Sequence, residues 1–471
     1  MKSTCFVFLT VAISLLVGVT SGVVRGAGIE AGVAAVDITP PLNYRMCGYF
    51  HERLSTGTHD PLMAKAIVLR QDGRQAAMVF CDLIGLPLEL TLHVRRAAEE
   101  RTGIPAANIL LAATHTHTGP LYTGAMRKHL HDLAVTKQGS DPAEKVDYPA
   151  QLLEKLVEVI AHAQAAAGPV KLSVGVGRQE GLSFNRRFHM KGGGPVRFNP
   201  GKMNPDILRP AGPIDPEVGV LLFRSTADDR PLASLTVFAL HLDTVGGLEY
   251  SADFPYYLEQ SLRQELGEAF LSFFGNGTCG DINHVDVSHN RPQGGHQAAE
   301  RIGRTLAATV KATLNDSSEV KKPSLDVRTE VLHVPLQQPG EDEIAWAREA
   351  MKKVHTPEMP FLDRVKAYNI AALELIGGDT LPVTVQVFRI ADEAAVVALP
   401  GEPFVDLGLA IKKASPFATT IVIELAHDAP AYFPTRKAFA EGSYETVNCR
   451  IRPGGGEMLV DAAVRLLSDL K

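Results

Sequence analysis

An apolar run that ends abruptly in a polar motif constrains this chain more than any other feature. Residues 109–113 (ILLAA) predict a buried strand, and the motif THTHTGP follows at residues 114–120, closing on a Gly-Pro turn signal. Imidazoles two residues apart lie on one face of an extended chain. His115 and His117 therefore suit either joint binding of one metal ion or a division between metal and substrate, because neutral imidazole is the commonest metal ligand. A polar strand end with solvated histidines is the alternative.

Further residues with metal-binding or acid–base side chains stand shortly after other apolar segments. These are His241 after residues 237–240, Asp281 after 271–274, Glu402 after 396–400 and Tyr432 after 421–425. In mixed α/β sheets, ligands gather at strand ends, where loops supply the chemistry. Taken singly, Asp281 is typical of a turn and Glu402 of a helix N-terminus. Their shared position instead predicts a single site.

The order of expected elements predicts an α/β fold with mixed β-sheets covered by α-helices. Strands are expected at residues 29–38, 64–70, 76–83, 109–113, 170–176, 217–223, 232–240, 269–274, 330–335, 384–390, 394–399 and 419–423. Helices are expected at 88–102, 148–166, 256–266, 297–314, 341–353, 404–413 and 459–470. Residues 121–147 are polar and predict no regular element. Residues 192–213, rich in Gly and Pro, predict a long loop of the kind that forms lids or binding sites.

Composition and the N-terminus indicate an exported globular protein. The chain has 471 residues, 45% hydrophobic and 21% charged, with a net charge of −6 that gives no sign of a nucleic-acid surface. Lys2, the apolar run at 5–19 and the small residues after it are typical of a secretory signal peptide over residues 1–27. We therefore expect a secreted or periplasmic protein with one domain at 28–471. A membrane anchor is the alternative, although the run is short for a bilayer.

Four cysteines remain after the expected signal peptide. They are Cys47, Cys81, Cys279 and Cys449. In an exported chain they permit three complete pairings, and sequence does not choose among them. Their spacing contains no CxxC, so a thiolate zinc site is not expected.

These motifs, in this order and approximate spacing, resemble those of the neutral/alkaline non-lysosomal ceramidases, a family of zinc-dependent amidases. The matching elements are THTHTGP at residues 114–120, Asn185-Arg186, HLDT at 241–244, GDIN at 280–283, PGE at 400–402, and the tyrosines Tyr432 and Tyr444. The resemblance runs from about Ala31 to the C-terminus. It implies the α/β fold of the family's catalytic domain. Because the chain ends soon after the tyrosines, the C-terminal immunoglobulin-like domain of full-length members is expected to be missing.

The resemblance also implies a role for each matching residue. Zinc would be held by His115, His241, Glu402 and Tyr432. His117 and Arg186 would face the substrate, with Asp281 beside the reacting centre. His117 or Asp281 would carry a proton to the leaving amine, and Arg186, with Tyr444, would stabilise the oxyanion. The other histidines are expected to be structural or solvent-facing, with His284 the strongest exception.

One departure from the family pattern bears on the substrate. Asn283 stands where ceramidases carry a reactive serine, and an amide cannot replace that hydroxyl. The main hypothesis is a zinc-dependent hydrolase that cleaves an amide (N-acyl) bond in a small-molecule or lipid-like substrate by a metal-activated water. One alternative is the same scaffold acting on an ester, an N-acyl amino sugar or a carbohydrate-linked compound. The other is a non-catalytic, zinc-containing binding protein.

Overall fold

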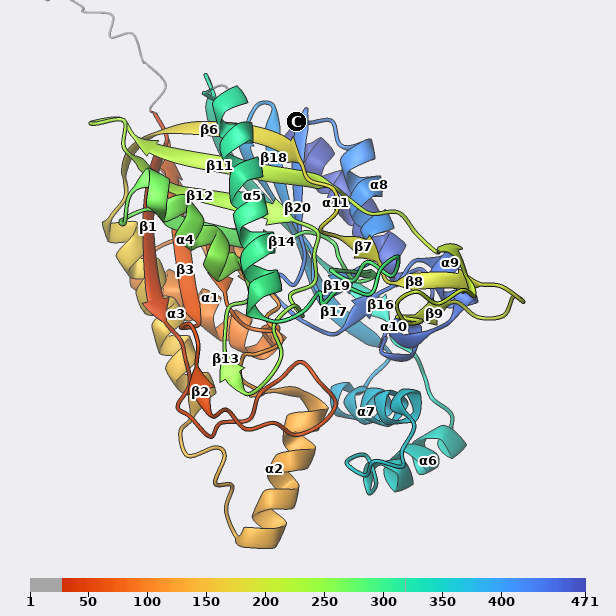
Figure 1. Cartoon of the computed structure of the whole chain (residues 1–471). Helices are drawn as coiled ribbons and strands as arrows, with labels where there is room; N and C mark the ends of the chain where they lie inside the picture. The colour runs from red at the N-terminus through yellow and green to blue at the C-terminus, as the bar shows by residue number, and fades with distance from the viewer. Residues whose placement is uncertain (1–27, 318) are drawn as a thin grey trace, which may run out of the picture.

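An eight-stranded mixed β-sheet forms the first half of the molecule (Figure 1). The computed structural model describes residues 28–317 and 319–471; the expected signal peptide lies outside them. In spatial order the strands are β14 (Leu271–Asn276), β12 (Pro231–Phe238), β11 (Glu217–Ser225), β6 (Gly168–Arg178), β1 (Glu30–Asp37), β3 (Met63–Gln71), β4 (Arg74–Cys81) and β5 (Ile109–Ala113). The mixed α/β fold predicted from the sequence is confirmed.

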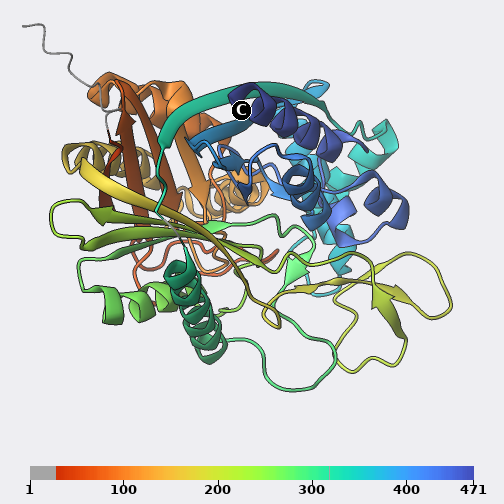
Figure 2. The same cartoon turned by 90° about the horizontal axis from the view of Figure 1, so that it is seen from above.

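A four-stranded sheet packs against one face of the larger sheet (Figure 2). Its strands are β16 (Pro323–Pro335), β17 (Thr380–Ala391), β18 (Ala394–Ala398) and β20 (Thr419–Ile423). Both sheets contribute to one buried cluster, with Phe80 and Phe273 from the larger sheet and Phe388 and Ile421 from the smaller. Burying each such side chain stabilises the fold by about 1.5–3 kcal/mol.

Helices cover the outer face of each sheet, so strands such as β4 and β18 are buried on both sides. The larger sheet is covered by α1 (Leu88–Thr102), α3 (Tyr148–Ala165), α4 (Phe254–Leu266) and α5 (His296–Asp316), and the smaller by α8 (Val405–Ala414) and α11 (Gly455–Leu470). In β4, Met78 and Phe80 face the other sheet, whereas Val79 and Cys81 face the helices. This two-sided burial explains why these strands read as continuous apolar runs, whereas the partly exposed β6 and β16 alternate.

The two sheets meet at the carboxyl ends of their parallel strands. β5 is parallel to β4, β14 to β12, and β20 to β18. The backbone N–H of Glu424 donates to Asn276 O at 2.8 Å, and that of His427 donates to Leu111 O at 2.7 Å. These hydrogen bonds join the segment after β20 to β14 and β5 of the larger sheet, near the points where those strands end.

Short paired strands fix the loops at this end. They are β2 (Gly57–Thr58) with β13 (Glu249–Tyr250), β7 (Phe184–Asn185) with β15 (Ile282–Asn283), and β19 (Glu402–Pro403) with β21 (Tyr432–Phe433). The 3-10 helix Ala106–Asn108 and the short helices α9 (Arg436–Glu441) and α10 (Tyr444–Val447) complete the connections.

Two predictions about connecting regions were wrong. Residues 121–147 contain the helix α2 (Gly124–Gln138), which buries only Leu130 and Ala134 and so lacks an apolar stripe to reveal it. The long Gly- and Pro-rich loop contains β9 (Arg197–Phe198) and β10 (Ile207–Pro210), which both pair with β8 (Arg187–Met190). No helix was predicted for α7 (Phe361–Ile376), which packs with α6 (Glu341–Met351) in an insertion between β16 and β17.

The four cysteines within the described residues are free thiols. Cys47, Cys81, Cys279 and Cys449 are all buried and unpaired, so none of the possible disulfides forms among these four residues. Over residues 28–317 and 319–471, no helix has both the length and the apolar character that a membrane crossing requires.

Candidate metal centre

His115 is held in a strained backbone conformation just after β5. Its φ of +81° lies in the left-handed region, which is costly for a residue with a side chain. The backbone N–H of His115 donates to Leu83 O, and its ring Nδ1 lies 2.7 Å from Ile84 O. A carbonyl accepts only from a protonated nitrogen, so Nδ1 carries the proton and Nε2 keeps its lone pair. This contact fixes the tautomer that a metal ligand at Nε2 requires.

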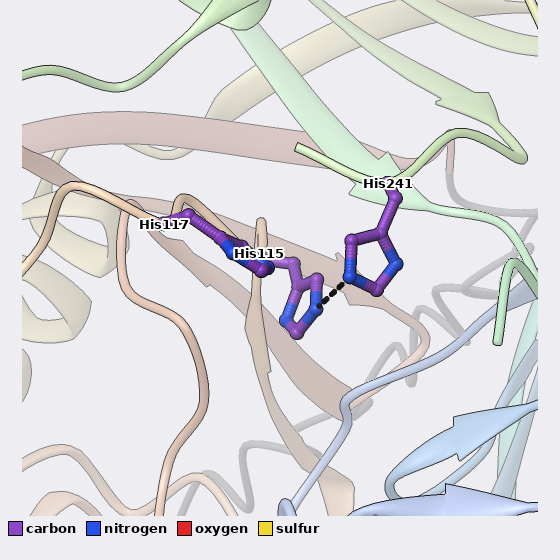
Figure 3. A group of neighbouring side chains, drawn as sticks. All are labelled: His115, His117 and His241. Atoms are coloured by element: carbon purple, nitrogen blue, oxygen red, sulfur yellow. Dashed lines mark hydrogen bonds between the residues drawn. The ribbon is translucent and has the colours of Figure 1, made fainter. Parts of the chain in front are cut away.

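His241 presents its own Nε2 to that lone pair. The two Nε2 atoms are 3.0 Å apart (Figure 3). The Nδ1 atom of His241 lies 3.7 Å from Cys279 Sγ. Burial, and then the neighbouring His115, lowers the pKa of His241 well below its usual value. The two facing Nε2 atoms can share one proton or one cation between them.

Glu402 brings a carboxylate to the same point. Gly401, the preceding residue, has a φ of +60°, and a Cβ atom added there would lie only 2.5 Å from Ala431 O. The position therefore requires glycine, and the tight turn that it forms places Glu402 at the site. Glu402 Oε2 lies 3.5 Å from His115 Nε2 and 4.0 Å from His241 Nε2. Burial raises its pKa, but His115 and other neighbours outweigh burial and leave it below the usual value. The group is therefore a carboxylate at neutral pH.

Tyr432 stands beside Glu402 because β19 and β21 pair in parallel, with these two residues in register. Its hydroxyl accepts a hydrogen bond of 3.0 Å from Arg186 Nη2. Burial, together with the Glu402 charge, raises the pKa of Tyr432 well above its usual value. The phenol is therefore protonated here, and its ionisation would need a cation at the site.

His117 completes a group of three imidazoles. Ring nitrogens of His115, His117 and His241 all lie within 4.8 Å of one another (Figure 3). Burial lowers the pKa of His117 to about 3, which keeps the ring neutral. Neither of its buried nitrogens has a hydrogen-bond partner among the described residues. His117 is thus available either to a metal or to a reacting group.

The donor set fits a divalent transition metal. Catalytic zinc sites use imidazole and carboxylate ligands and keep one position open for water. Within the described chain, Glu402 Oε2 has no hydrogen-bond partner, and neither has the His117 ring. Both of these unpaired groups lie beside the facing imidazoles of His115 and His241. Tetrahedral zinc with Zn–N bonds of about 2.0–2.1 Å separates two nitrogens by about 3.3 Å. The observed 3.0 Å between His115 and His241 is close to that spacing.

Arg186 lies at the back of this group in a buried network. Its Nε donates to Glu445 Oε1 at 3.0 Å and its Nη2 to Gly280 O at 2.7 Å, besides the bond to Tyr432. Glu445 Oε2 also accepts from Arg187 at 2.9 Å. Sequence reasoning missed Glu445, which has no motif of its own and is marked only by its position next to Tyr444. The network holds the Arg186 guanidinium firmly against the tyrosine.

Asp281 and Asn283 are engaged in loop structure. Asp281 accepts hydrogen bonds from Asn185 Nδ2 at 2.7 Å and from the backbone of Val405, the first residue of α8, at 2.9 Å. Burial raises the pKa of Asp281 to about 6. Asn283 Nδ2 donates to Asn199 Oδ1 at 3.0 Å, which ties the long loop to β15. These contacts favour a positioning role for both residues over direct proton transfer.

A line of aromatic rings leads from the centre to the surface. Tyr444 packs 5.5 Å from Tyr432 and 5.5 Å from Phe361, measured between ring centroids. Phe361, at the start of α7, is 46% exposed and also contacts Phe50 at 5.9 Å. The missed helix α7 therefore supplies the outer part of an apolar wall beside the candidate metal ligands.

A hydrogen-bonded pair of a carboxylate and a histidine, Asp243 and His284, lies near His117. His284 Nδ1 is 3.1 Å from Asp243 Oδ1, and the Asp243 charge acts to raise the pKa of His117 against the effect of burial. Sequence analysis singled out His284 as the exception among the remaining histidines but proposed no partner. Asp243, two residues after His241, was within the matched motif and had no assigned role.

Comparison with known proteins identifies the relatives of this fold. Residues 29–249 match the family described as neutral/alkaline non-lysosomal ceramidase, N-terminal. The neutral ceramidase of Pseudomonas aeruginosa is 26% identical over 268 residues, which is 54% of this chain and 36% of that protein. The neutral ceramidase of Mycobacterium tuberculosis is 28% identical over 267 residues, 51% of this chain and 40% of that protein. These alignments thus span well under half the length of either relative.

Solved structures show the same fold over nearly the whole chain. The crystal structure of neutral ceramidase from Pseudomonas aeruginosa superposes with a TM-score of 0.71 and 20% identity, covering 94% of this chain and 74% of that one. A structure titled as a ceramidase complexed with C2 gives a TM-score of 0.70 and 18% identity, covering 94% and 75%. The predicted family resemblance is confirmed.

Proposed function

We propose that this chain is a zinc-dependent hydrolase of amide (N-acyl) bonds. Its residues 29–249 match the family described as neutral/alkaline non-lysosomal ceramidase, N-terminal. The observation that carries the proposal is the convergence of His115, His241, Glu402 and Tyr432 from four separate loops. Unsatisfied donor atoms at the same point add to it. Most buried polar atoms in proteins have a hydrogen-bond partner, so unpaired atoms on two side chains that border the same imidazoles support a site for a ligand.

The chemistry divides between the metal and the chain. Bound zinc lowers the pKa of a water molecule and polarises a carbonyl group. His117, whose ring nitrogens have no hydrogen-bond partner among the described residues, would accept a proton from the attacking water at its unprotonated nitrogen and pass it to the leaving amine. Arg186 and the Tyr444 hydroxyl lie on the Tyr432 side, where they stabilise negative charge that develops on the carbonyl oxygen.

An apolar part of the substrate is proposed to lie along the aromatic wall. The rings of Tyr444, Phe361 and Phe50 lead from the centre to solvent and provide a surface for an acyl or alkyl chain. Asn283 stands where the family's reactive serine is expected, and its amide is bonded to Asn199. This departure supports the runner-up, the same scaffold acting on an ester or an N-acyl sugar.

Hydrolysis of matched substrates tests the proposed function. We expect the purified protein to release fatty acid from an N-acyl amine, to lose that activity to a strong chelator, and to recover it with added Zn²⁺. His115→Ala and His241→Ala should abolish turnover, whereas His162→Ala, on the exposed side of α3, should not change it. Faster cleavage of the matched ester or N-acyl sugar would establish the runner-up. Turnover that survives both metal removal and His241→Ala would exclude the metal mechanism.

Export is part of the same proposal. The basic start, apolar run and small residues within residues 1–27 support a signal peptide followed by a hydrolase domain at 28–471. Expression of the full chain in a secreting host, followed by N-terminal sequencing, tests it. A start close to Ala27 or Gly28 is expected, and an uncleaved, membrane-bound product would support an anchor instead.

A further inference from the structure

A second group of histidine and carboxylate side chains lies apart from the candidate metal centre. His59 and Asp60 directly follow β2, and His296 is the first residue of α5. One donor atom from each of the three lies within 4.8 Å of the others. The imidazole rings of His59 and His296 are stacked with centroids 3.6 Å apart and planes at 16°. This group shares no residue with the first site.

The carboxylate of this group is preorganised. Asp60 is 1% exposed, and it accepts hydrogen bonds from the backbone of Ala252 and from Ser251 Oγ, both at 2.7 Å. His59 Nδ1 lies 2.9 Å from Asp60 Oδ2. A buried carboxylate held by fixed donors and contacting an imidazole is the supporting arrangement that accompanies many metal ligands.

The imidazoles are suited to a cation at their other nitrogen. His296 Nδ1 lies 3.2 Å from the Tyr257 hydroxyl, and His59 Nδ1 contacts Asp60, so these contacts use Nδ1 and leave Nε2 to a ligand. Burial, and then the neighbouring His59, lowers the pKa of His296, which favours the neutral ring that binds metals. With 35% of its side chain exposed, His59 can be reached by an ion from solvent.

We propose that His59 and His296 are imidazole ligands in a second binding site for a divalent transition metal, with Asp60 supporting His59 through its Nδ1. Imidazole ligands favour Zn²⁺ and its neighbours over Ca²⁺ or Mg²⁺, which prefer oxygen ligands. The proposal does not depend on the proposed hydrolase function, because it concerns binding alone.

A metal at this site would act on the histidine motif through one residue. Ser251 Oγ donates to Asp60. Ser251 O accepts from Thr116 Oγ1 at 2.6 Å and from Thr118 Oγ1 at 2.9 Å. These two threonines flank His117 in the motif. An ion that fixes Asp60 and its neighbours would therefore stiffen the turn that carries His115 and His117, which makes the second site a support for the first.

Metal titration of variants tests the second site. In the His115→Ala/His241→Ala protein, which lacks ligands of the first site, we expect about one equivalent of Zn²⁺ or Co²⁺ to bind, since a site of this type holds one ion. Adding His59→Ala and His296→Ala should abolish this binding, whereas adding His162→Ala should leave it unchanged. Full retention of the equivalent in the quadruple variant, or no binding to the double variant, would overturn the proposal.

A second measurement tests the site even if the multiple variants fold poorly. Wild type and His59→Ala/His296→Ala are compared by metal analysis after Zn²⁺ loading, with circular dichroism to confirm the fold. The loss of one of two bound ions supports the second site, while an unchanged metal content contradicts it. Because the first site keeps all its ligands in this variant, a failure here leaves the proposed hydrolase untouched.

Discussion

Glu402 and Tyr432 are direct neighbours because two short strands, β19 and β21, pair in parallel with these residues in register. The two side chains are far apart in sequence, yet the pairing gives their relative position little freedom. The tight turn at Gly401 and the Arg186 bond to the tyrosine hydroxyl hold the pair from both sides. The carboxylate and phenol of the candidate metal centre are thus positioned by backbone structure.

Replacing the Glu402 carboxylate by an amide should weaken metal binding while keeping the fold. Glu402→Gln preserves shape but removes the charge that faces the two imidazoles. We expect zinc affinity to fall by at least about 100-fold, more than the 10–100-fold typical of supporting residues. Competition with a chromophoric chelator measures this. Glu393→Gln, an exposed position, is the control and should change nothing. Equal affinities in the two variants would contradict the ligand assignment.

Alanine at position 401 should destabilise the protein strongly. Gly401 has φ +60°, and an added Cβ would lie 2.5 Å from Ala431 O, so strain and steric overlap act together. Gly193→Ala is a matched control, because Gly193 has φ +76° but nothing within 4 Å. Left-handed backbone alone costs about 1–2 kcal/mol, and we expect Gly401→Ala to cost more than about 3 kcal/mol in urea unfolding. Similar costs for both variants would show that the contact is not limiting.

Removing the Glu445 charge should take away the carboxylate that pairs with two buried guanidinium groups. Glu445 pairs with Arg186 at 3.0 Å and with Arg187 at 2.9 Å, and all three side chains are almost fully buried. Glu445→Gln removes the carboxylate that both guanidinium groups share and leaves Arg187 only its longer contact to Glu441, at an expected cost of about 3–5 kcal/mol in unfolding free energy. Glu441→Gln, which loses a longer and more exposed contact to Arg187, should cost much less. If the two variants are equally stable, the network does not support Arg186.

Stability should depend on the protonation of Asp428. Burial raises the pKa of Asp428 from 3.8 to about 6, so between these values the folded protein binds a proton that the unfolded chain has lost. Stability from this group is therefore present at low pH and is lost as pH rises from about 4 to 7, by up to about 3 kcal/mol. Relative to Asp428→Asn, the wild type should lose unfolding free energy across this window. Parallel pH profiles for the two proteins would rule this out.

The parts of the site that depend on strand ends could be predicted from sequence. His115, His241, Glu402 and Tyr432 each follow an apolar run, and buried parallel strands are recognisable because both of their faces are apolar. Their common location follows from the rule that functional loops gather at the carboxyl ends of such strands.

The remaining parts were hidden for physical reasons. α2 buries few residues, so its sequence carries no helical stripe. Glu445 and Asp243 act through side-chain contacts made across hundreds or tens of residues, which no local pattern encodes. The hydrogen bonds that Asp281 accepts from Asn185 and from the backbone of Val405 also appear only in three dimensions.

The position of a bound metal tests the central claim most directly. Crystals of zinc-loaded protein, measured on both sides of the zinc absorption edge, would locate the ion without reference to activity. We expect an anomalous peak within bonding distance of His115, His241, Glu402 and Tyr432, at about 2.0–2.2 Å from nitrogen and oxygen ligands. An empty position among these four side chains in protein that still hydrolyses its substrate would contradict the account.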